Sequence, residues 1–229
     1  MSTIGFIGSG NIGGAIARLA VAAGYDVVLS NSRGPESLAG LVADLGPRAN
    51  AGTPAEAAAA GDLVVVAVPL PAYASVPVEA LHGKVVVDRG NYFPERFGQV
   101  PALDAGTTTT SQLLQDRLPG SSVVKAFSNI SFTLVGQLPR AAGDPARSAL
   151  PIAGDDGEAK AEVARVVDDL GFDAVDVGVL ADGWRFERGQ PAFVAPYNGD
   201  EPGVWPPLVA RPVGREALDA VLLAAARAV

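Results

Sequence analysis

The residues best suited to chemistry stand at the start of the chain, where residues 3–13 read Thr-Ile-Gly-Phe-Ile-Gly-Ser-Gly-Asn-Ile-Gly. An apolar stretch runs into G-x-G-x-x-G and then into a helical pattern, which is the order of a dinucleotide-binding strand–turn–helix unit. Gly8 permits the tight turn, Gly10 leaves room for a pyrophosphate, and Gly13 lets the helix approach the strand. Backbone N–H groups at the helix start favour negative charge. A glycine turn without a ligand is the alternative. We predict a phosphate site formed by Gly8, Ser9, Gly10, Asn11, Ile12 and Gly13.

The next informative residues end the second predicted strand, which covers residues 27–30. An NAD-selective unit places an Asp or Glu here, about 20 residues after the glycines, to bind the ribose 2′-hydroxyl. This strand tip has no acid and offers hydroxyls, an amide and a guanidinium, which suit a 2′-phosphate. Arg33 as a solvated loop charge is the alternative. We predict an NADP(H) site that includes Ser30, Asn31, Ser32 and Arg33.

Three further loops are selected because ligands of a doubly wound sheet bind at the carboxyl ends of its strands. They are expected to border the nicotinamide. Asn91 and Asn129 suit the orientation of a carboxamide or a substrate, and Phe127 suits the shielding of a ring. Each has a structural alternative, a turn for asparagine and the core for phenylalanine. The cofactor-binding candidates in these loops are Val68, Pro69, Asn91, Ala126 and Phe127.

Candidate catalytic groups are few, and only Tyr92 and Asn129 are placed to serve. A phenol with an ordinary pKa of about 10 would need tuning to donate a proton at neutral pH. His82 lies between a predicted helix and a strand at the opposite edge of the sheet, so it is interpreted as a helix C-terminal residue. With one histidine and no cysteine, no metal site is expected.

Strands alternate with helices along the chain, which predicts an α/β fold with a doubly wound, mainly parallel Rossmann sheet and a small C-terminal appendage. Further strands are expected at residues 63–68, 84–88, 123–127, 150–154 and 172–176. Helices are expected at 11–23, 35–45, 53–61, 71–81, 111–118, 156–170 and 214–228. Thr109 or Thr110 should cap the helix at 111–118, and Asp155-Asp156 is interpreted as a helix cap rather than a metal site.

The composition changes near residue 181. Residues 184–212 contain both tryptophans and six prolines with little periodicity. We predict an NADP-binding Rossmann domain at residues 1–180 and a C-terminal wrap and helix at 181–229, which would serve the acceptor or a dimer contact.

The composition also limits the partners. The 229 residues carry a net charge of −8, which disfavours nucleic acid and anionic membranes. No apolar run is long enough for a membrane span and no signal peptide precedes the first strand, so a cytoplasmic location is expected.

Five stretches together resemble one family. They are Ile-Gly-Phe-Ile-Gly-Ser-Gly-Asn-Ile-Gly at 4–13, Ser-Asn-Ser-Arg-Gly-Pro-Glu-Ser-Leu at 30–38, Val-Val-Asp-Arg-Gly-Asn-Tyr-Phe-Pro-Glu-Arg at 86–96, Val-Val-Lys-Ala-Phe-Ser-Asn-Ile at 123–130 and Leu-Pro-Ile-Ala-Gly-Asp-Asp at 150–156. As a set they look like the NADP-dependent reductases of the deazaflavin coenzyme F420. The resemblance covers roughly residues 1–180 and implies hydride transfer between NADP(H) and a deazaflavin, usually by a homodimer.

Two departures from the family pattern concern the second substrate. The chain has Lys125-Ala-Phe-Ser-Asn where the family has Lys-Ala-Phe-Asn-Thr, and the tail from residue 184 has no counterpart. Ferric-reductase domains and pyrroline-carboxylate reductases have a similar fold, so the N-terminal motif does not determine which molecule accepts the hydride.

Three functions fit the residues. The first is hydride transfer between NADP(H) and a deazaflavin or flavin, in which two rings stack and the protein supplies no general acid. The second is reduction of a small carbonyl or imine by NADPH, which would require Tyr92 or Tyr197 as proton donor. The third is a non-catalytic NADP-binding module that senses redox state or binds a partner. For the two enzymatic functions the predicted partner is a small-molecule redox acceptor.

Overall fold

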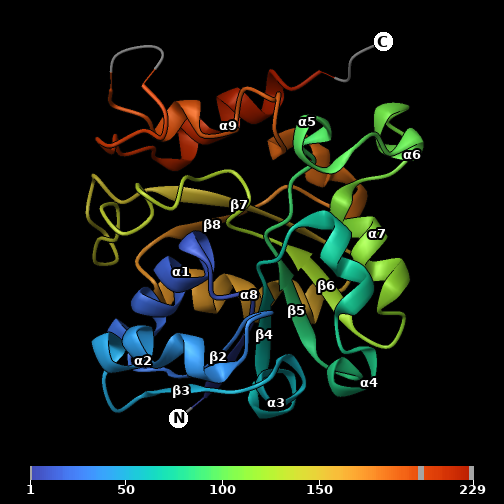
Figure 1. Ribbon diagram of the computed structural model, residues 1–229. Coiled ribbons are helices and arrows are strands. Elements are labelled where there is room, and N and C mark those ends of the chain that lie inside the picture. The colour runs from blue at the N-terminus through green and yellow to red at the C-terminus, as the bar shows by residue number, and fades with distance from the viewer. Residues whose placement is uncertain (1, 201–203, 227–229) are drawn as a thin grey trace.

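The computed structural model describes residues 2–200 and 204–226, which form a three-layer α/β arrangement around one sheet (Figure 1). The strands follow the order β3-β2-β1-β4-β5-β6-β7-β8. All neighbouring pairs are parallel except β6 and β7, which are antiparallel. The predicted doubly wound, mainly parallel Rossmann sheet is therefore confirmed. The strands are β1 (Thr3–Ile7), β2 (Asp26–Ser30), β3 (Ala49–Ala51), β4 (Leu63–Val66), β5 (Val85–Asp88), β6 (Ser122–Lys125), β7 (Ala149–Gly154) and β8 (Asp173–Asp176).

Helices cover both faces of the sheet. One core cluster joins the strands to α1, α2, α8 and α9, and a second cluster joins the other face to α3, α4 and α7. The α-helices are α1 (Asn11–Ala22), α2 (Ala39–Leu45), α3 (Pro54–Ala60), α4 (Val78–Leu81), α5 (Pro94–Phe97), α6 (Pro101–Asp104), α7 (Thr110–Arg117), α8 (Gly157–Asp169) and α9 (Arg215–Leu223). Four 3-10 helices are η1 (Pro35–Leu38), η2 (Leu70–Ser75), η3 (Leu180–Phe186) and η4 (Ala195–Tyr197).

Several boundaries differ from the sequence prediction. The helix expected at 71–81 is divided into η2 and α4 because Pro77 lacks an N–H and disfavours helical backbone at the residue before it. The helix expected at 35–45 begins as the 3-10 turn η1. The last helix ends at Leu223, and residues 227–228 of its predicted range lie outside the described residues. The short elements β3, α5 and α6 were not predicted because four residues or fewer carry too little periodicity.

The predicted helix starts are confirmed by their caps. Thr109, rather than Thr110, caps α7 and forms a capping box with Gln112. Asp156 caps α8 by accepting hydrogen bonds from the N–H groups of Glu158 and Ala159. His82 stands at the C-cap of α4, as interpreted. Asp156 therefore has the predicted capping role, whereas Asp155 accepts from the N–H of Leu180 at 2.8 Å and does not cap the helix.

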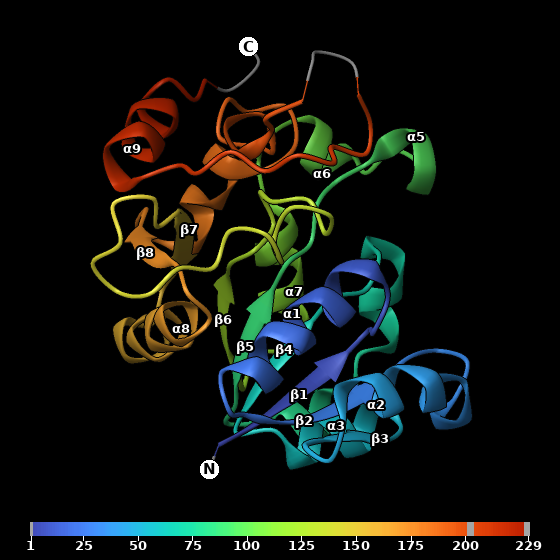
Figure 2. The same cartoon turned by 90° about the vertical axis from the view of Figure 1, so that its left-hand side faces the viewer.

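The C-terminal segment lies across the upper end of the molecule, beside α5 and α6, in both views (Figure 2). Its large side chains do not form a separate core, because Phe186, Tyr197 and Leu218 belong to the same cluster as Ile16 of α1 and Val163 of α8. The division at residues 180/181 stays a prediction. Within the described residues, no helix combines the length and the apolar character that crossing a membrane requires.

Candidate active site

The glycine motif forms the turn between β1 and α1, and its three glycines do not serve the same purpose. An added Cβ at Gly8 would lie 2.5 Å from the carbonyl oxygen of Ala67, and the φ of Gly8 is +101°. At Gly13 an added Cβ would lie 2.0 Å from the oxygen of Gly8. At Gly10, chain neighbours aside, it would meet no atom of the described residues within 4 Å. Packing therefore requires the first and last glycines, whereas Gly10 leaves space that a ligand can fill.

A crevice of about 740 Å³ opens beside this turn, at the carboxyl ends of β1, β2 and β4. A second hollow, of about 650 Å³, adjoins it through Ser9, Gly10 and Arg33 and extends over α1 past Asn11. The start of α1 has no side-chain cap and no acid in its first turn, so its N–H groups and dipole face this space. The predicted residues that line the crevice are Gly8, Ser9, Gly10, Asn31, Ser32, Arg33, Val68 and Pro69.

At the end of β2 and in the loop after it, two polar side chains bond within the protein and two are exposed to solvent. Ser30 is fully buried, and its Oγ donates to the carbonyl oxygen of Phe6 at 2.7 Å. The prediction that this side chain contacts a 2′-phosphate is therefore wrong. Asn31 shapes the turn, because its Oδ1 accepts from the N–H of Arg33 at 2.8 Å and its Nδ2 donates to the Oγ of Ser37 at 2.8 Å. Ser32 and Arg33 are exposed. Across residues 2–200 and 204–226, the Arg33 guanidinium has no hydrogen-bond or ion-pair partner, which leaves its charge available.

Two candidates at the glycine turn have limited roles. The Oγ of Ser9 donates to the carbonyl oxygen of Ser30 at 3.0 Å and so ties the turn to β2. The side chain of Ile12 belongs to the core, so this residue offers a ligand only its backbone.

In the loops after β5 and β6, the structure contradicts the predicted roles of the side chains at the nicotinamide. The ring of Phe127 is buried and meets Phe172 edge-to-face at 6.5 Å between centroids, so it does not shield a cofactor. Ala126 is fully buried in the same core. The Nδ2 of Asn91 donates to the carbonyl oxygen of Ser128 at 2.6 Å, and its Oδ1 accepts from the N–H of Arg188 at 3.1 Å. These side chains hold the loops together rather than face the crevice.

The two weak catalytic candidates are likewise engaged elsewhere. Asn129 is fully buried, and its Nδ2 donates to the carbonyl oxygen of Ala192 and to the hydroxyl of Tyr197. The hydroxyl of Tyr92 donates to Asp104 at 2.7 Å and accepts from the N–H of Val100 at 2.8 Å. Burial, with the hydrogen bond to Asp104, raises the pKa of Tyr92 against the opposing effect of the Val100 N–H. The phenol is thereby a weaker acid than usual.

A buried ionic network under these loops was missed by the sequence reasoning. Lys125 is fully buried and lies 2.9 Å from the carboxylate of Glu187. Its Nζ also donates to the carbonyl oxygen of Gly90 at 2.9 Å and to the hydroxyls of Thr110 and Ser111. Burial acts to raise the pKa of Glu187, but the Lys125 ammonium and the hydrogen bond from the Thr110 hydroxyl lower it by more. The pKa of Glu187 therefore lies below its usual value. The signal in the sequence was a lone charge that ends each of two apolar strands, Asp88 and Lys125.

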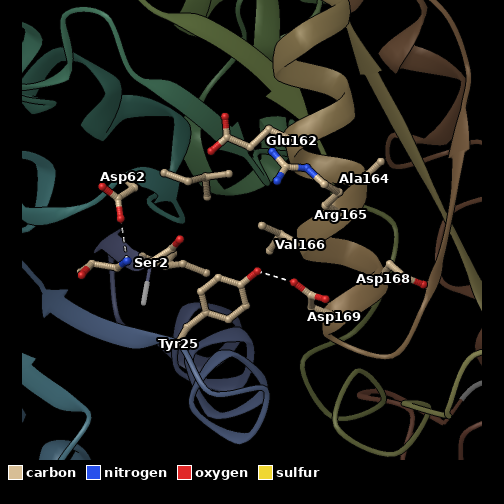
Figure 3. Close-up of a pocket in the computed structure, with 12 residues that line it drawn as sticks. Ser2, Tyr25, Asp62, Glu162, Ala164, Arg165, Val166, Asp168 and Asp169 are labelled. Atoms are coloured by element: carbon tan, nitrogen blue, oxygen red, sulfur yellow. Dashed lines mark hydrogen bonds between the residues drawn. The ribbon is translucent and has the colours of Figure 1, made fainter.

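Another hollow, of about 400 Å³, lies at the opposite edge of the sheet against α8 (Figure 3). Its polar groups face one another. The hydroxyl of Tyr25 donates to the carboxylate of Asp169, and the N–H of Thr3 donates to Asp62 at 2.9 Å. Burial, with the hydrogen bond to Asp169, raises the pKa of Tyr25 to about 12.

The fold and the open glycine turn together define a dinucleotide-binding protein of the Rossmann class. Comparisons with known proteins agree. Residues 3–92 match the family described as NADP oxidoreductase, coenzyme F420-dependent. The crystal structure of hypothetical protein SMa0349 from Sinorhizobium meliloti has a TM-score of 0.73 and 31% sequence identity, covering 84% of this chain and 93% of that one. The structure of a proposed F420-dependent NADP reductase from Arthrobacter sp. FB24 has a TM-score of 0.66 and 28% identity, covering 78% of this chain and 86% of that one.

Over residues 3–92 the chain is similar to this family of NADP-dependent oxidoreductases. It is also 32% identical to the metalloreductase STEAP3 of Rattus norvegicus over 186 residues, which is 80% of this chain. It spans only 35% of that relative's length.

Proposed function

We propose that the chain binds NADP(H) across the crevice and transfers hydride between it and a deazaflavin or flavin-type acceptor. The observation that carries the cofactor part is the Arg33 guanidinium, which lines the crevice beside a strand tip that has no acid and which has no partner in the part of the chain that the structure describes. A charged donor at this place favours a cofactor with a 2′-phosphate. The open space at Gly10 and the uncapped start of α1 suit the pyrophosphate.

The acceptor part is supported by the chemistry of the crevice lining. Its described residues include no His, Tyr, Cys, Lys, Asp or Glu. Reduction of a carbonyl or an imine needs a proton donor near the hydride, whereas transfer between two stacked rings needs mainly orientation. Burial raises the pKa of Tyr197 as well as that of Tyr92, so neither tyrosine suits proton donation at neutral pH. When bound, the nicotinamide supplies the hydride, and the protein binds and orients the two rings.

The test is to mix the protein with NADPH and a panel of acceptors and to follow the loss of reduced-nicotinamide absorbance. The panel contains a deazaflavin, FMN, a ferric chelate, a quinone and a cyclic imine. The ferric chelate is included because the rat relative is named a metalloreductase. We expect turnover with the deazaflavin or the flavin. Turnover with the imine alone would contradict the proposal, and tight NADPH binding with no turnover would favour the non-catalytic module.

The predicted homodimer belongs to this proposal too. It is supported by exposed apolar side chains, since Trp205 is 69% exposed and Leu208 is 61% exposed. Phe132, which lines the second hollow, is 38% exposed. A dimer would bury this surface. Light scattering at several protein concentrations tests it, and a monomer throughout would contradict it.

A further inference from the structure

Arg89 follows β5 at the carboxyl edge of the sheet and is not part of the Lys125–Glu187 network. Its N–H donates to the carbonyl oxygen of Val66, the last residue of β4, at 3.3 Å. The two residues after Val66 are Ala67 and Val68, and both line the crevice. Arg89, the first residue of the loop after β5, therefore lies beside the strand end that leads into the proposed nucleotide crevice.

The guanidinium of Arg89 has no hydrogen-bond or ion-pair partner among the described residues. Its Nε is sealed from solvent without a hydrogen bond, and the described parts of the chain provide no partner for the rest of the group. The adjacent carboxylate of Asp88 does not serve, because it accepts from Tyr73, Ser111 and the N–H of Gly90. Burial lowers the pKa of Arg89, while the charge of Asp88 acts to raise it. An arginine nevertheless stays charged at neutral pH, and the half-buried guanidinium of Arg89 keeps donors that no group of the described residues uses.

The same edge of the sheet holds the other unsatisfied groups. Among the described residues, three buried side-chain atoms have no hydrogen-bond partner: Arg89 Nε, Ser128 Oγ and Asn129 Oδ1. Arg89 lies in the loop after β5, and the other two lie in the loop after β6, which Asn91 ties to the first. Buried polar groups in folded proteins are almost always paired. Three unpaired atoms in two adjoining loops indicate a site that a polar ligand completes.

We propose that Arg89 binds an anionic group, a phosphate or a carboxylate, on the hydride acceptor and so makes the site selective for anionic acceptors. The proposal rests on the proposed function, since it concerns the second substrate of that site. A guanidinium is suited to this role because its planar donors bind phosphate and carboxylate in bidentate fashion. The cofactor's own phosphates already have separate partners in Arg33 and the start of α1, which lie at the ends of β2 and β1.

The test compares FMN with riboflavin, which share one ring system and differ by a phosphate. Equilibrium binding of both is measured with NADP⁺ present, for the unaltered protein, Arg89→Met and Arg89→Lys. Arg165→Met, at the opposite edge of the sheet, is the matched control. The unaltered protein should bind FMN about 10- to 150-fold more tightly than riboflavin, as expected for a charge-assisted hydrogen bond. Arg89→Met should abolish that preference, Arg89→Lys should retain part of it, and Arg165→Met should keep it whole.

Two controls distinguish an acceptor contact of Arg89 from a cofactor contact and from a purely structural role. NADPH affinity should be unchanged in Arg89→Met, whereas a loss of NADPH affinity with the FMN preference retained would assign the anion to the cofactor and overturn the proposal. The ligand-free thermal midpoint of Arg89→Met should equal or exceed that of the unaltered protein, because an unpaired charge is removed. Equal affinity for FMN and riboflavin in the unaltered protein, or binding of neither, would also overturn it. Since these are binding measurements, they stand apart from the turnover test, whose failure alone would refute only the proposed hydride transfer.

Discussion

The two edges of the sheet each carry a hollow, yet they treat their polar groups in opposite ways. At the amino edge, Tyr25 is bonded to Asp169 and Thr3 to Asp62, so these polar groups are paired, while the Arg165 side chain lies exposed to solvent. At the carboxyl edge, Arg33 and Arg89 have no partner within the described chain, and Gly10 faces open space. A hollow alone therefore does not mark a site. The carboxyl edge differs because its hollow combines the open position at Gly10, the uncapped start of α1 and the Arg33 guanidinium.

The largest effect should come from closing the open space at Gly10. Gly10→Val places a branched side chain where the pyrophosphate would approach, and we expect NADPH binding to weaken about 100-fold or more, since a clash of about 3 kcal/mol corresponds to that factor. The fold should persist, because no protein atom lies within 4 Å of an added Cβ there. Gly40→Val is the matched control, since position 40 is equally open but outside the crevice. Retained NADPH affinity in folded Gly10→Val would remove the contrast between the edges.

The second prediction concerns the buried ionic network of the carboxyl edge. Lys125→Met leaves the Glu187 carboxylate without its cation, and the free energy of unfolding should fall by about 3–5 kcal/mol. Urea denaturation measures this, and the double variant Lys125→Met/Glu187→Gln should recover part of the loss. A loss below about 1 kcal/mol in the single variant would show that the pair does not hold the loops.

The third prediction sharpens the assignment of Arg33, in the loop after β2. Arg33→Ala should weaken NADPH binding by about 10- to 150-fold and leave NADH binding almost unchanged. Arg33→Asp should weaken NADPH further through repulsion, and added salt should reduce the wild-type preference because the loop is exposed. Dissociation constants for both cofactors decide the matter. An equal loss for the two would mean that Arg33 does not contact the 2′-phosphate.

The fourth prediction is a small effect at the carboxyl edge. If hydride passes between two rings, Tyr92→Phe should change the single-turnover rate by less than about 2-fold, because no phenolic proton is used. The lost hydrogen bonds to Asp104 and Val100 are local to α6 and its approach. A loss of about 10²–10⁴-fold with NADPH affinity intact would instead identify a proton donor and favour a carbonyl or imine substrate.

The smallest effect should arise at the amino edge. Tyr25→Phe should leave NADPH binding unchanged and lower the free energy of unfolding by about 0.5–1.5 kcal/mol, nearer the lower figure because the bond is partly exposed. The pKa of Tyr25 rises from 10.0 to about 12 on folding. Its contribution is therefore full below the unfolded value and is lost as the pH rises from about 10 to about 12. Urea midpoints of both proteins should converge over that range, and a gap that widens would refute the assignment.

Much of the nucleotide half was predictable from local sequence. The glycine motif, the acid-free tip of β2 and the caps at Thr109 and Asp156 all act over a few residues, so their spacing carries the information. Ser30 shows the limit of this reasoning. Its hydroxyl belongs by type to the predicted phosphate loop, but strand pairing turns it toward the carbonyl of Phe6.

The loops after β5 and β6 were less predictable from the sequence, for a physical reason. Asn91, Asn129 and Phe127 were selected correctly as residues of the loops after β5 and β6, yet each side chain bonds or packs to groups far away in the chain, Arg188, Tyr197 and Phe172. The sequence by itself determined the parallel sheet, the glycine turn and the acid-free strand tip, because periodicity and short-range stereochemistry specify them. Only the tertiary structure decided which polar groups are left unpaired, because pairing depends on partners that folding brings together from distant parts of the chain.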